Sequence, residues 1–332
     1  MAIASTAVSS GCSAGEPTAP QSPATSPSSA AASPGQGAGT VQPAVTAEEA
    51  RSLLARYVQL NNKANKTFDV GLLRSYEGGA SFAIDSAGYV SARELKAKPG
   101  GAFTYVDPVF YVSAKGGEEW VLTTVRRDVN GGKKSDRLTY LLFSKTPDGW
   151  RQIYAPDGAA GDTARPKIDV TAAGTVKELP LTASTGLMTS PGNFAKLYAR
   201  QLTGGGTPEA KARFAVDDDL ANRAASSRRN MNRYARVTEK VRPAPEYPSL
   251  ALRVADGGAL VFTTLARTSR YDVRPGNYVY NEHLASLAGR HHRFMIVNDL
   301  IEVVAHIPPR NARLQQFTVL GSYWAAVSGS GS

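Results

Sequence analysis

The sequence VLTTVRR, residues 121–127, has a counterpart 140 positions later in VFTTLAR, residues 261–267. Each copy follows a turn with two adjacent glycines, Gly116-Gly117 in the first half and Gly257-Gly258 in the second. Apolar and β-branched residues that follow such a turn are typical of an antiparallel strand. The two stretches therefore predict that a strand of the first half has an equivalent in the second.

Each half also begins with a predicted helix. Thr46-Ala47-Glu48-Glu49 is a capping box, and an amphipathic face that begins at Ala50 continues from it to about Leu60. In the second half Ser190 and Pro191 occupy the N-cap and first helical positions, 144 residues after Thr46. Two matches in the same order and at nearly the same offset favour a duplicated unit of one helix followed by a sheet.

The remaining strands are predicted from alternation and turn residues. Pro108, inside the first of them, indicates a sheet edge or a bulge. A further helix is predicted between Pro208 and about Thr238, and no element is assigned to residues 61–102. The predicted strands are 103–114, 119–127, 137–144, 149–154, 249–255, 259–270, 293–306 and 314–327.

Short turns join neighbouring antiparallel strands, so the chain is predicted to be α+β, with two similar units of a helix on a curved antiparallel sheet. This layout resembles the cystatin-like or nuclear-transport-factor-2-like folds, and that resemblance implies a cone with a pocket between helix and sheet. The predicted divisions are a signal remnant, lipid-attachment cysteine and disordered linker at 1–46, a first unit at 47–155, a connector at 156–189, a second unit at 190–327 and a flexible tail at 328–332.

The cysteine Cys12 is the only one in the chain, so an internal disulfide is excluded. It follows Ser9-Ser10-Gly11 and precedes a long spacer, and 36 of the first 46 residues are Ala, Ser, Thr, Pro or Gly. Such a spacer cannot bury enough apolar surface to fold. Small residues before a cysteine resemble the end of a bacterial lipoprotein signal, although Ser9 stands where an aliphatic residue is usual. The alternative is an incidental free thiol.

The whole layout resembles the uncharacterised secreted lipoproteins of actinobacteria that carry a domain of unknown function. The resemblance covers most of the chain and rests on three features: the cysteine, the Ser/Pro/Ala spacer and about 280 residues of helix and antiparallel strands. It implies a lipid anchor at the extracytoplasmic face of the cell membrane. It supplies no catalytic motif.

Known catalytic and cofactor motifs are absent. The sequence contains no HExxH, no SxxK, no GxGxxG and no GxxxxGK[ST]. The adjacent His291 and His292 would point to opposite faces of a strand and could not share one metal ion. Asp217-Asp218-Asp219 fits the start of a helix better than a calcium loop. We therefore predict no cofactor, no metal site and no catalytic residue.

A cone-shaped fold can carry a pocket between its helix and its sheet, and candidate lining residues for such a pocket lie in the first unit. Asp107 and Asp128 are the candidate acids there, although aromatic residues at strand spacing more often form a core. The candidate lining residues are Tyr57, Tyr105, Phe110, Trp120, Tyr140 and Tyr154.

The net charge of +10 is concentrated in the second half. If the helix predicted at 208–238 forms, Arg229, Arg233 and Arg236 fall on one face, with Arg223 and Arg228 nearby. A basic face can be simple solvation, or it can attract anionic lipid or wall polymer. Nucleic acid is an unsuitable partner outside the cell, and a protein partner is not indicated.

Two functions follow from these observations. The first is a lipid-anchored, non-catalytic binding or scaffolding module of the cell envelope. The alternative is a small-molecule enzyme that uses a general acid or base in a cone-shaped pocket. A solute-binding lipoprotein is disfavoured because its fold needs alternating βαβ units.

Overall fold

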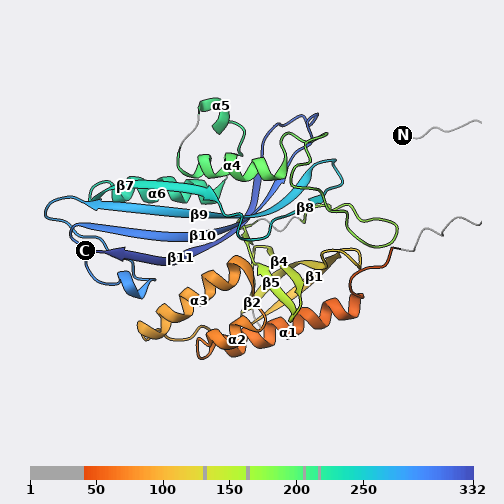
Figure 1. Ribbon diagram of the computed structural model, residues 1–332, viewed down its shortest axis with the longest axis horizontal. Coiled ribbons are helices and arrows are strands. Elements are labelled where there is room, and N and C mark those ends of the chain that lie inside the picture. The colour runs from red at the N-terminus through yellow and green to blue at the C-terminus, as the bar shows by residue number, and fades with distance from the viewer. Residues whose placement is uncertain (1–40, 130–132, 162–164, 205–206, 216–217) are drawn as a thin grey trace, which may run out of the picture. The chain divides into compact units, whose positions relative to one another are not determined.

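The computed structural model describes residues 41–332, apart from 130–132, 162–164, 205–206 and 216–217 (Figure 1). Cys12 and most of the predicted linker lie outside the described residues. The chain from Thr40 to Ser332 forms one compact unit. Its helices are α1 (Ala47–Asn65), α2 (Val70–Arg74), α3 (Gly79–Glu94), α4 (Pro191–Leu202), α5 (Pro208–Lys211) and α6 (Asp219–Met231), with a 3-10 turn at Ala285–Leu287.

The strands form one sheet that confirms the α+β class. Along the main path the strand order is β1-β2-β4-β6-β11-β10-β9-β7, and all of these neighbours are antiparallel. The strands are β1 (Phe103–Val112), β2 (Trp120–Val129), β3 (Lys133–Lys134), β4 (Thr139–Thr146), β5 (Gly149–Tyr154), β6 (Asp157–Gly158), β7 (Ala235–Pro243), β8 (Leu250–Arg253), β9 (Ala259–Val273), β10 (Phe294–Ile307) and β11 (Thr318–Gly331).

The helix starts follow the predicted capping. The Thr46 hydroxyl accepts a bond from the amide of Glu49, and the Glu49 carboxylate accepts one from the amide of Thr46. At α4 the Ser190 side chain caps the amide of Asn193, with proline in the first turn. Asp218 caps α6 through the amide of Ala221. Local side-chain acceptors thus fix where these helices begin.

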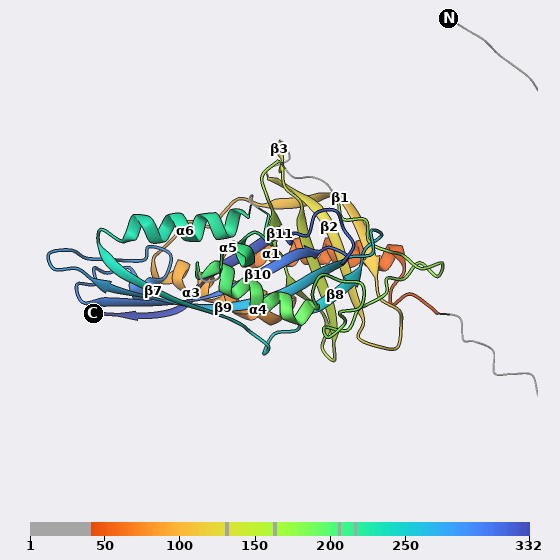
Figure 2. The same ribbon diagram turned by 90° about the horizontal axis from the view of Figure 1, so that it is seen from above.

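The two halves of the sheet pack against each other by their inner faces. Leu122, Tyr140 and Leu142 of the first half meet Phe262 and Val304 of the second in one buried cluster. The outer face of the first half is covered by α1, and the outer face of the second is covered by α4. Figure 1 shows α1 to α3 on one side of the long strands β9 to β11, with α4 and α6 on the other, and Figure 2 shows α4 lying across these strands.

The predicted irregularity at Pro108 is present. β1 is an edge strand, and its register with β2 shifts between Val106 and Val109. Asp107, next to the proline, has a positive φ of 54°. The missing amide of Pro108 therefore falls in a bulge, where no ladder bond is lost.

Three predictions for the chain need correction. The helical region predicted at 208–238 contains α5 and α6 but is wrong at its end, because α6 ends at Met231 and Ala235 begins β7, which pairs with β9. The flexible tail predicted at 328–332 is wrong as well, because Ser328 pairs with Asn298 within β11 and β10. Residues 61–102, for which the sequence predicts no element, contain the last turn of α1, all of α2 and all of α3.

The junction between the halves is only two residue pairs long. Gly158 of β6 pairs with Gly321 of β11, and Asp157 pairs with Ser322. A Cβ on Gly321 would stand 2.7 Å from the Asp157 carbonyl oxygen, closer than any ordinary contact. The halves approach each other here at a distance that only glycine permits.

We expect Gly321→Ala to lower the free energy of unfolding by about 1–3 kcal/mol, because backbone atoms must move to admit the methyl group. Gly100→Ala is the matched control, since a Cβ there meets nothing within 4 Å. Urea unfolding of both variants measures the difference. Equal stability of the two would show that the junction is not tightly packed.

Candidate functional site

A cleft of about 370 Å³ lies between α1, α3 and the outer face of the first half-sheet. Its wall is built from α1, the segment between α1 and α2, α3, β1, β2, β4, β6 and the C-terminal strand β11. It is lined by Tyr57, Asn61, Asn65, Phe68, Ile84, Asp85, Gly88, Tyr89, Phe103, Tyr105, Arg127, Thr139, Ala155, Asp157, Tyr323 and Ala325.

Polar residues of α1 face this cleft in a continuous hydrogen-bond chain. Tyr57, Asn61 and Asn65 are spaced four residues apart and therefore share one face of the helix. The Asn61 amide donates to the Tyr57 hydroxyl and to Glu77, and the Asn65 amide donates to Asn61. The Tyr89 hydroxyl of α3 donates to Asn65 at 2.6 Å. These bonds fix the side chains of one wall.

Three carboxyl groups lie on the α3 side of the cleft, opposite α1: one in the wall itself and two buried behind it. Asp85 of α3 faces the cleft and accepts a hydrogen bond from the Tyr323 hydroxyl. Glu77, just before α3, is 2% exposed, and Glu302 of β10 is fully buried. The Glu302 carboxyl accepts bonds from the Ser81 hydroxyl at 2.6 Å and from the Ala155 amide at 2.8 Å. It thereby ties α3 and the end of β5 to the second half-sheet.

Burial shifts the protonation of this carboxyl cluster. It raises the pKa of Glu302 to about 8, although the bonds from Ser81 and Ala155 lower it. It also raises the pKa of Glu77 well above its usual value, and the charges of Asp85 and Glu302 raise it further. The pKa of Asp85 is raised by burial to about 6, against the lowering effect of hydrogen bonds with Tyr323 and Glu77. Near neutral pH the cluster therefore has Asp85 as its ionised member.

Only some of the predicted lining residues meet in this cleft. Tyr57 and Tyr105 line it, and Phe110 packs in the adjacent core under α1. The other three predicted residues, Trp120, Tyr140 and Tyr154, lie in the core between the two half-sheets. Strand alternation explains the split, because neighbouring strand positions point to opposite faces.

The acids of the cleft differ from those predicted. Asp107 is exposed on β1, where it pairs with Lys134, and Asp128 is not among the lining residues. Asp85, Glu77 and Glu302 were missed. A signal for Glu302 exists in the sequence, since it interrupts the apolar run from Leu300 to Val304 at a position that a central strand buries.

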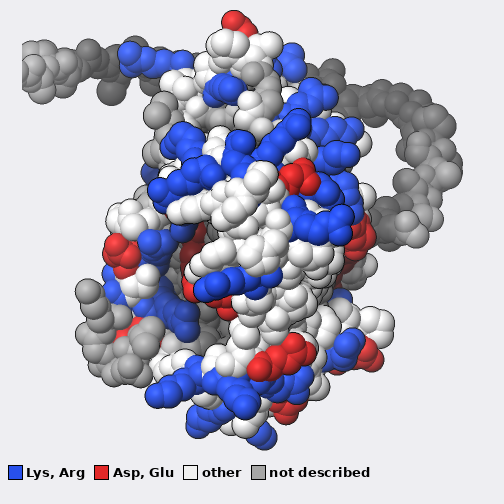
Figure 3. Space-filling view, turned by 90° about the vertical axis from the view of Figure 1, so that its left-hand side faces the viewer, with Lys and Arg blue, Asp and Glu red and all other residues white. Residues whose placement is uncertain are grey.

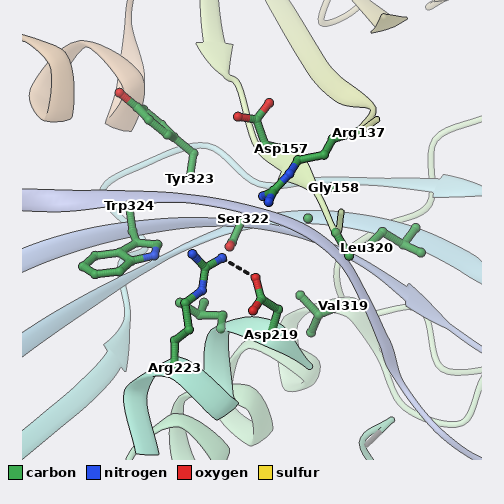
Figure 4. A pocket seen from close by; sticks show the side chains of 13 residues that line it. Arg137, Asp157, Gly158, Asp219, Arg223, Val319, Leu320, Ser322, Tyr323 and Trp324 are labelled. Carbon is green, nitrogen blue, oxygen red and sulfur yellow. Dashed lines mark hydrogen bonds and ion pairs between the residues drawn. The ribbon is translucent and has the colours of Figure 1, made fainter. Parts of the chain in front are cut away.

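A second, smaller hollow of about 190 Å³ lies on the other side of β11 (Figure 4). Arg137 and Arg223 point toward Ser322, and Asp219 pairs with Arg223. Tyr323 and Asp157 line both hollows but point away from these arginines. Strand β11 thus separates a side rich in carboxyl and tyrosine groups from a side rich in guanidinium groups.

The predicted basic stripe is divided between different elements. Arg223, Arg228 and Arg229 lie on α6, whereas Arg233 follows the helix and Arg236 is in β7. The single helical face assumed for them is therefore wrong. Arg228 has a structural role, because it pairs with Glu239 and donates to the Leu202 carbonyl at the end of α4. Figure 3 shows Lys and Arg side chains over the upper part of this end of the molecule, with acidic side chains between them.

Within the described part of the chain, no three His, Cys, Asp or Glu side chains are grouped so that they could hold a metal ion. The helices of that part also include none that is long and apolar enough to cross a membrane. His291 is buried, and His292 is exposed, with its Nδ1 atom 3.2 Å from the Asn277 carbonyl oxygen.

Comparison with known proteins gives a family and two relatives. A family profile described as "Domain of unknown function (DUF8094)" matches residues 41–331. The chain is 27% identical over 312 residues to an uncharacterized lipoprotein of Streptomyces coelicolor, covering 89% of this chain and 88% of that protein. It is 28% identical over 252 residues to an uncharacterized lipoprotein of Streptomyces avermitilis, covering 68% and 67%. No solved structure matches significantly.

The raised pKa of Glu302 makes stability depend on pH. Between about pH 4.5 and 8 the folded chain keeps a proton on Glu302 that the unfolded chain has lost, so the free energy of unfolding falls as pH rises. We expect Glu302→Gln to make this fall shallower by up to about 1.4 kcal/mol per pH unit. Urea titrations at several pH values from 5 to 8 measure it.

The matched control for that experiment is Glu94→Gln, the same change at an exposed position of α3. This variant should keep the slope of the unaltered chain. If Glu302→Gln keeps that slope as well, Glu302 is ionised in the folded state and the description of the cluster is wrong.

Proposed function

We propose that this chain, which belongs to the family defined by the domain of unknown function DUF8094, is a lipid-anchored protein of the extracytoplasmic face of the cell membrane. We propose further that its cleft binds a small molecule. The observation that carries the binding part is the cleft beside α1 and α3, with Asp85 and Tyr323 in its wall. The anchor has separate support.

The anchor is supported by the sequence and by the relatives. Both relatives are named lipoproteins, and Cys12 follows the small residues Ser9, Ser10 and Gly11. A diacylglyceryl group on this cysteine would supply two buried chains, and two are enough for stable attachment. The polar spacer up to Thr46 would then hold the folded unit away from the membrane surface.

Small-molecule binding is supported by the size and composition of the cleft. Its volume of about 370 Å³ lies in the range of known ligand pockets, roughly 300–1,000 Å³. Aromatic rings supply most of the apolar wall, and a few fixed polar groups are placed among them. This combination of apolar area with oriented hydrogen-bonding groups is typical of sites that bind and orient a small ligand.

We also propose that the fold arose from a duplicated unit. In the strand order, β1-β2-β4 on one side mirrors β7-β9-β10 on the other, with β6 and β11 at the centre. The repeated Thr-Thr strands are β2 and β9, each covered on its outer face by the helix that begins its half. A cystatin-like or nuclear-transport-factor-2-like origin of each unit would account for this symmetry.

The second candidate function is general acid and base catalysis in the same cleft. It is favoured by the nearness of the carboxyl groups of Glu77 and Asp85: burial raises the pKa of both, and the charge of Asp85 raises that of Glu77 further. A pair of this kind holds one proton between a protonated and an ionised carboxyl group. Asp85, which lines the cleft, could accept a proton from a bound molecule near neutral pH.

The anchor is tested by growing cells that express the full chain with labelled palmitate. We expect the label on the unaltered protein and on a Ser13→Ala control, and none on Cys12→Ala, because only the thiol can form the thioether to the diacylglyceryl group. Equal labelling of all three would remove the lipid anchor from the account.

Binding in the cleft is tested by filling it. A side chain on Gly88 has open space, since a Cβ there meets nothing within 4 Å, and this glycine lines the cleft. We expect Gly88→Leu to retain at least tenfold less of any small molecule that copurifies with the full chain, as measured by mass spectrometry after denaturation. Gly100→Leu, outside the cleft, is the control. Equal retention by both variants would contradict binding at this place.

A further inference from the structure

We infer that the ligand of the cleft carries a positively charged amine or quaternary ammonium group, held by Asp85 and Asp157 and by the surrounding tyrosine rings. This inference rests on the proposed binding function and specifies its ligand class. Three observations lead to it: the charges that line the cleft, the hydrogen-bonding capacity that remains free there, and the density of aromatic rings.

The charges that face the cleft are mainly negative. Asp85 and Asp157 line it, and the carboxyl groups of Glu77 and Glu302 lie behind Asp85. Arg127 is the only Lys or Arg among the described lining residues. It is exposed, and its guanidinium group lies 4.2 Å from the centre of the Phe103 ring. A cationic ligand would therefore meet two carboxylates and one cation that is already turned onto an aromatic face.

Apart from those of Arg127, most side-chain hydrogen-bond donors of the cleft are committed within the protein. Asn61 uses both amide hydrogens on Tyr57 and Glu77, and Tyr89 donates to Asn65. Tyr323 donates to Asp85, in the same wall.

Thr139 donates to Asp157 at 2.6 Å. The hydroxyls of Tyr57 and Tyr105, one hydrogen of the Asn65 amide and the N–H groups of the exposed Arg127 remain as donors, and the Asp85 and Asp157 carboxylates keep free lone pairs. A carboxylate oxygen can accept more than one hydrogen bond. The acceptor capacity beside Asp85 and Asp157 is thus unfilled, which suits a ligand that donates, as a protonated amine does; a quaternary ammonium group would instead be held by charge and by the aromatic rings.

Aromatic rings surround these carboxylates. Phe68 packs edge-on against Tyr89 with ring centres 5.7 Å apart, and Phe103 packs against Tyr105 at 5.2 Å. The six rings of the lining belong to Tyr57, Phe68, Tyr89, Phe103, Tyr105 and Tyr323. Ring faces attract cations, and aromatic walls combined with a carboxylate are the usual chemistry of quaternary ammonium sites. The contact of Arg127 with Phe103 is an example of this attraction within the cleft itself.

The protonation of Asp85 makes such binding dependent on pH. Since its pKa is about 6, Asp85 is largely protonated at pH 5 and largely ionised at pH 7. Glu302, with a pKa of about 8, keeps its proton across this range. The other groups that face Asp85 are Glu77, the tyrosines 57, 76, 89, 105 and 323, and, across the cleft, Asp157 and Arg127.

Burial raises the pKa of Glu77, of Asp157 and of each of these tyrosines, and the tyrosines therefore stay protonated over this range. Asp85 is then the member of the carboxyl cluster that titrates between pH 5 and 7. A bound cation favours its ionised form, so affinity should rise with pH over this range, by about tenfold from pH 5 to pH 7.

The inference is tested by calorimetric titration of the full chain with choline and with spermidine, each beside a neutral counterpart. For choline this is 3,3-dimethyl-1-butanol, which has the same shape without the charge. We expect at least one of the two cations to bind about tenfold or more tightly than its counterpart. Asp85→Asn should weaken that binding by a similar factor and remove its pH dependence. Asp157→Asn should weaken it as well.

Asp148→Asn, in the exposed turn between β4 and β5, is the matched control and should bind as the unaltered chain does. Thermal unfolding of each variant checks that it is folded. The inference would be overturned if neither cation binds more tightly than its neutral counterpart. It would also be overturned if Asp85→Asn leaves cation binding unchanged.

The same titrations with glucose and citrate separate this inference from the function on which it rests. If glucose or citrate binds, loses this binding in Gly88→Leu, and the cations do not bind, then the cleft holds a ligand but not a cationic one. Binding of none of these probes, together with no copurifying molecule, would reject both.

Discussion

The arrangement of the molecule depends on one buried carboxyl group, that of Glu302. It lies in the middle of β10 with no exposure to solvent, yet its contacts are with the first half of the chain, through Ser81 of α3 and Ala155 after β5. The Gln152 amide donates to the same Ser81 hydroxyl, so that three elements share one polar network. Because an uncompensated buried charge is costly, this network requires the protonated form of Glu302 that its raised pKa provides.

The fixed position of α3 explains why a cleft exists on one half and not in the same form on the other. In the first half α3 faces α1 across the cleft, and its Asp85 lines the space between them. In the second half the corresponding space under α4 is filled by aromatic rings. Phe194, Tyr198, Phe214 and Phe317 are all buried there, with ring centres of neighbouring pairs 5.1 to 6.4 Å apart. Similar architecture therefore leaves an open cleft in one half and forms a solid core in the other.

Much of the scaffold could be predicted from local sequence. The capping box at Thr46, the Ser190-Pro191 start and the strands with glycine turns were each determined by neighbouring residues, and the structure places these elements as predicted. Helix α3 was missed because its sequence, GASFAIDSAGYVSARE, contains two glycines and three serines in place of a strong aliphatic stripe. Its position is fixed by tertiary contacts such as the bond from Ser81 to Glu302, which a local pattern does not contain. The same holds for the acids, since Asp85 and Glu302 are 217 residues apart in sequence.

The central claim, that the cleft beside Asp85 binds a cationic ligand, is tested most directly by NMR of the tyrosine rings during addition of choline and spermidine. The account predicts that the ring signals of Tyr57, Tyr89, Tyr105 and Tyr323 shift together and saturate at one ligand concentration, while those of Tyr140 and Tyr198 in the two closed cores stay unchanged. Shifts confined to the exposed Tyr234, Tyr278 and Tyr280, or no saturable shift with either cation, would contradict it.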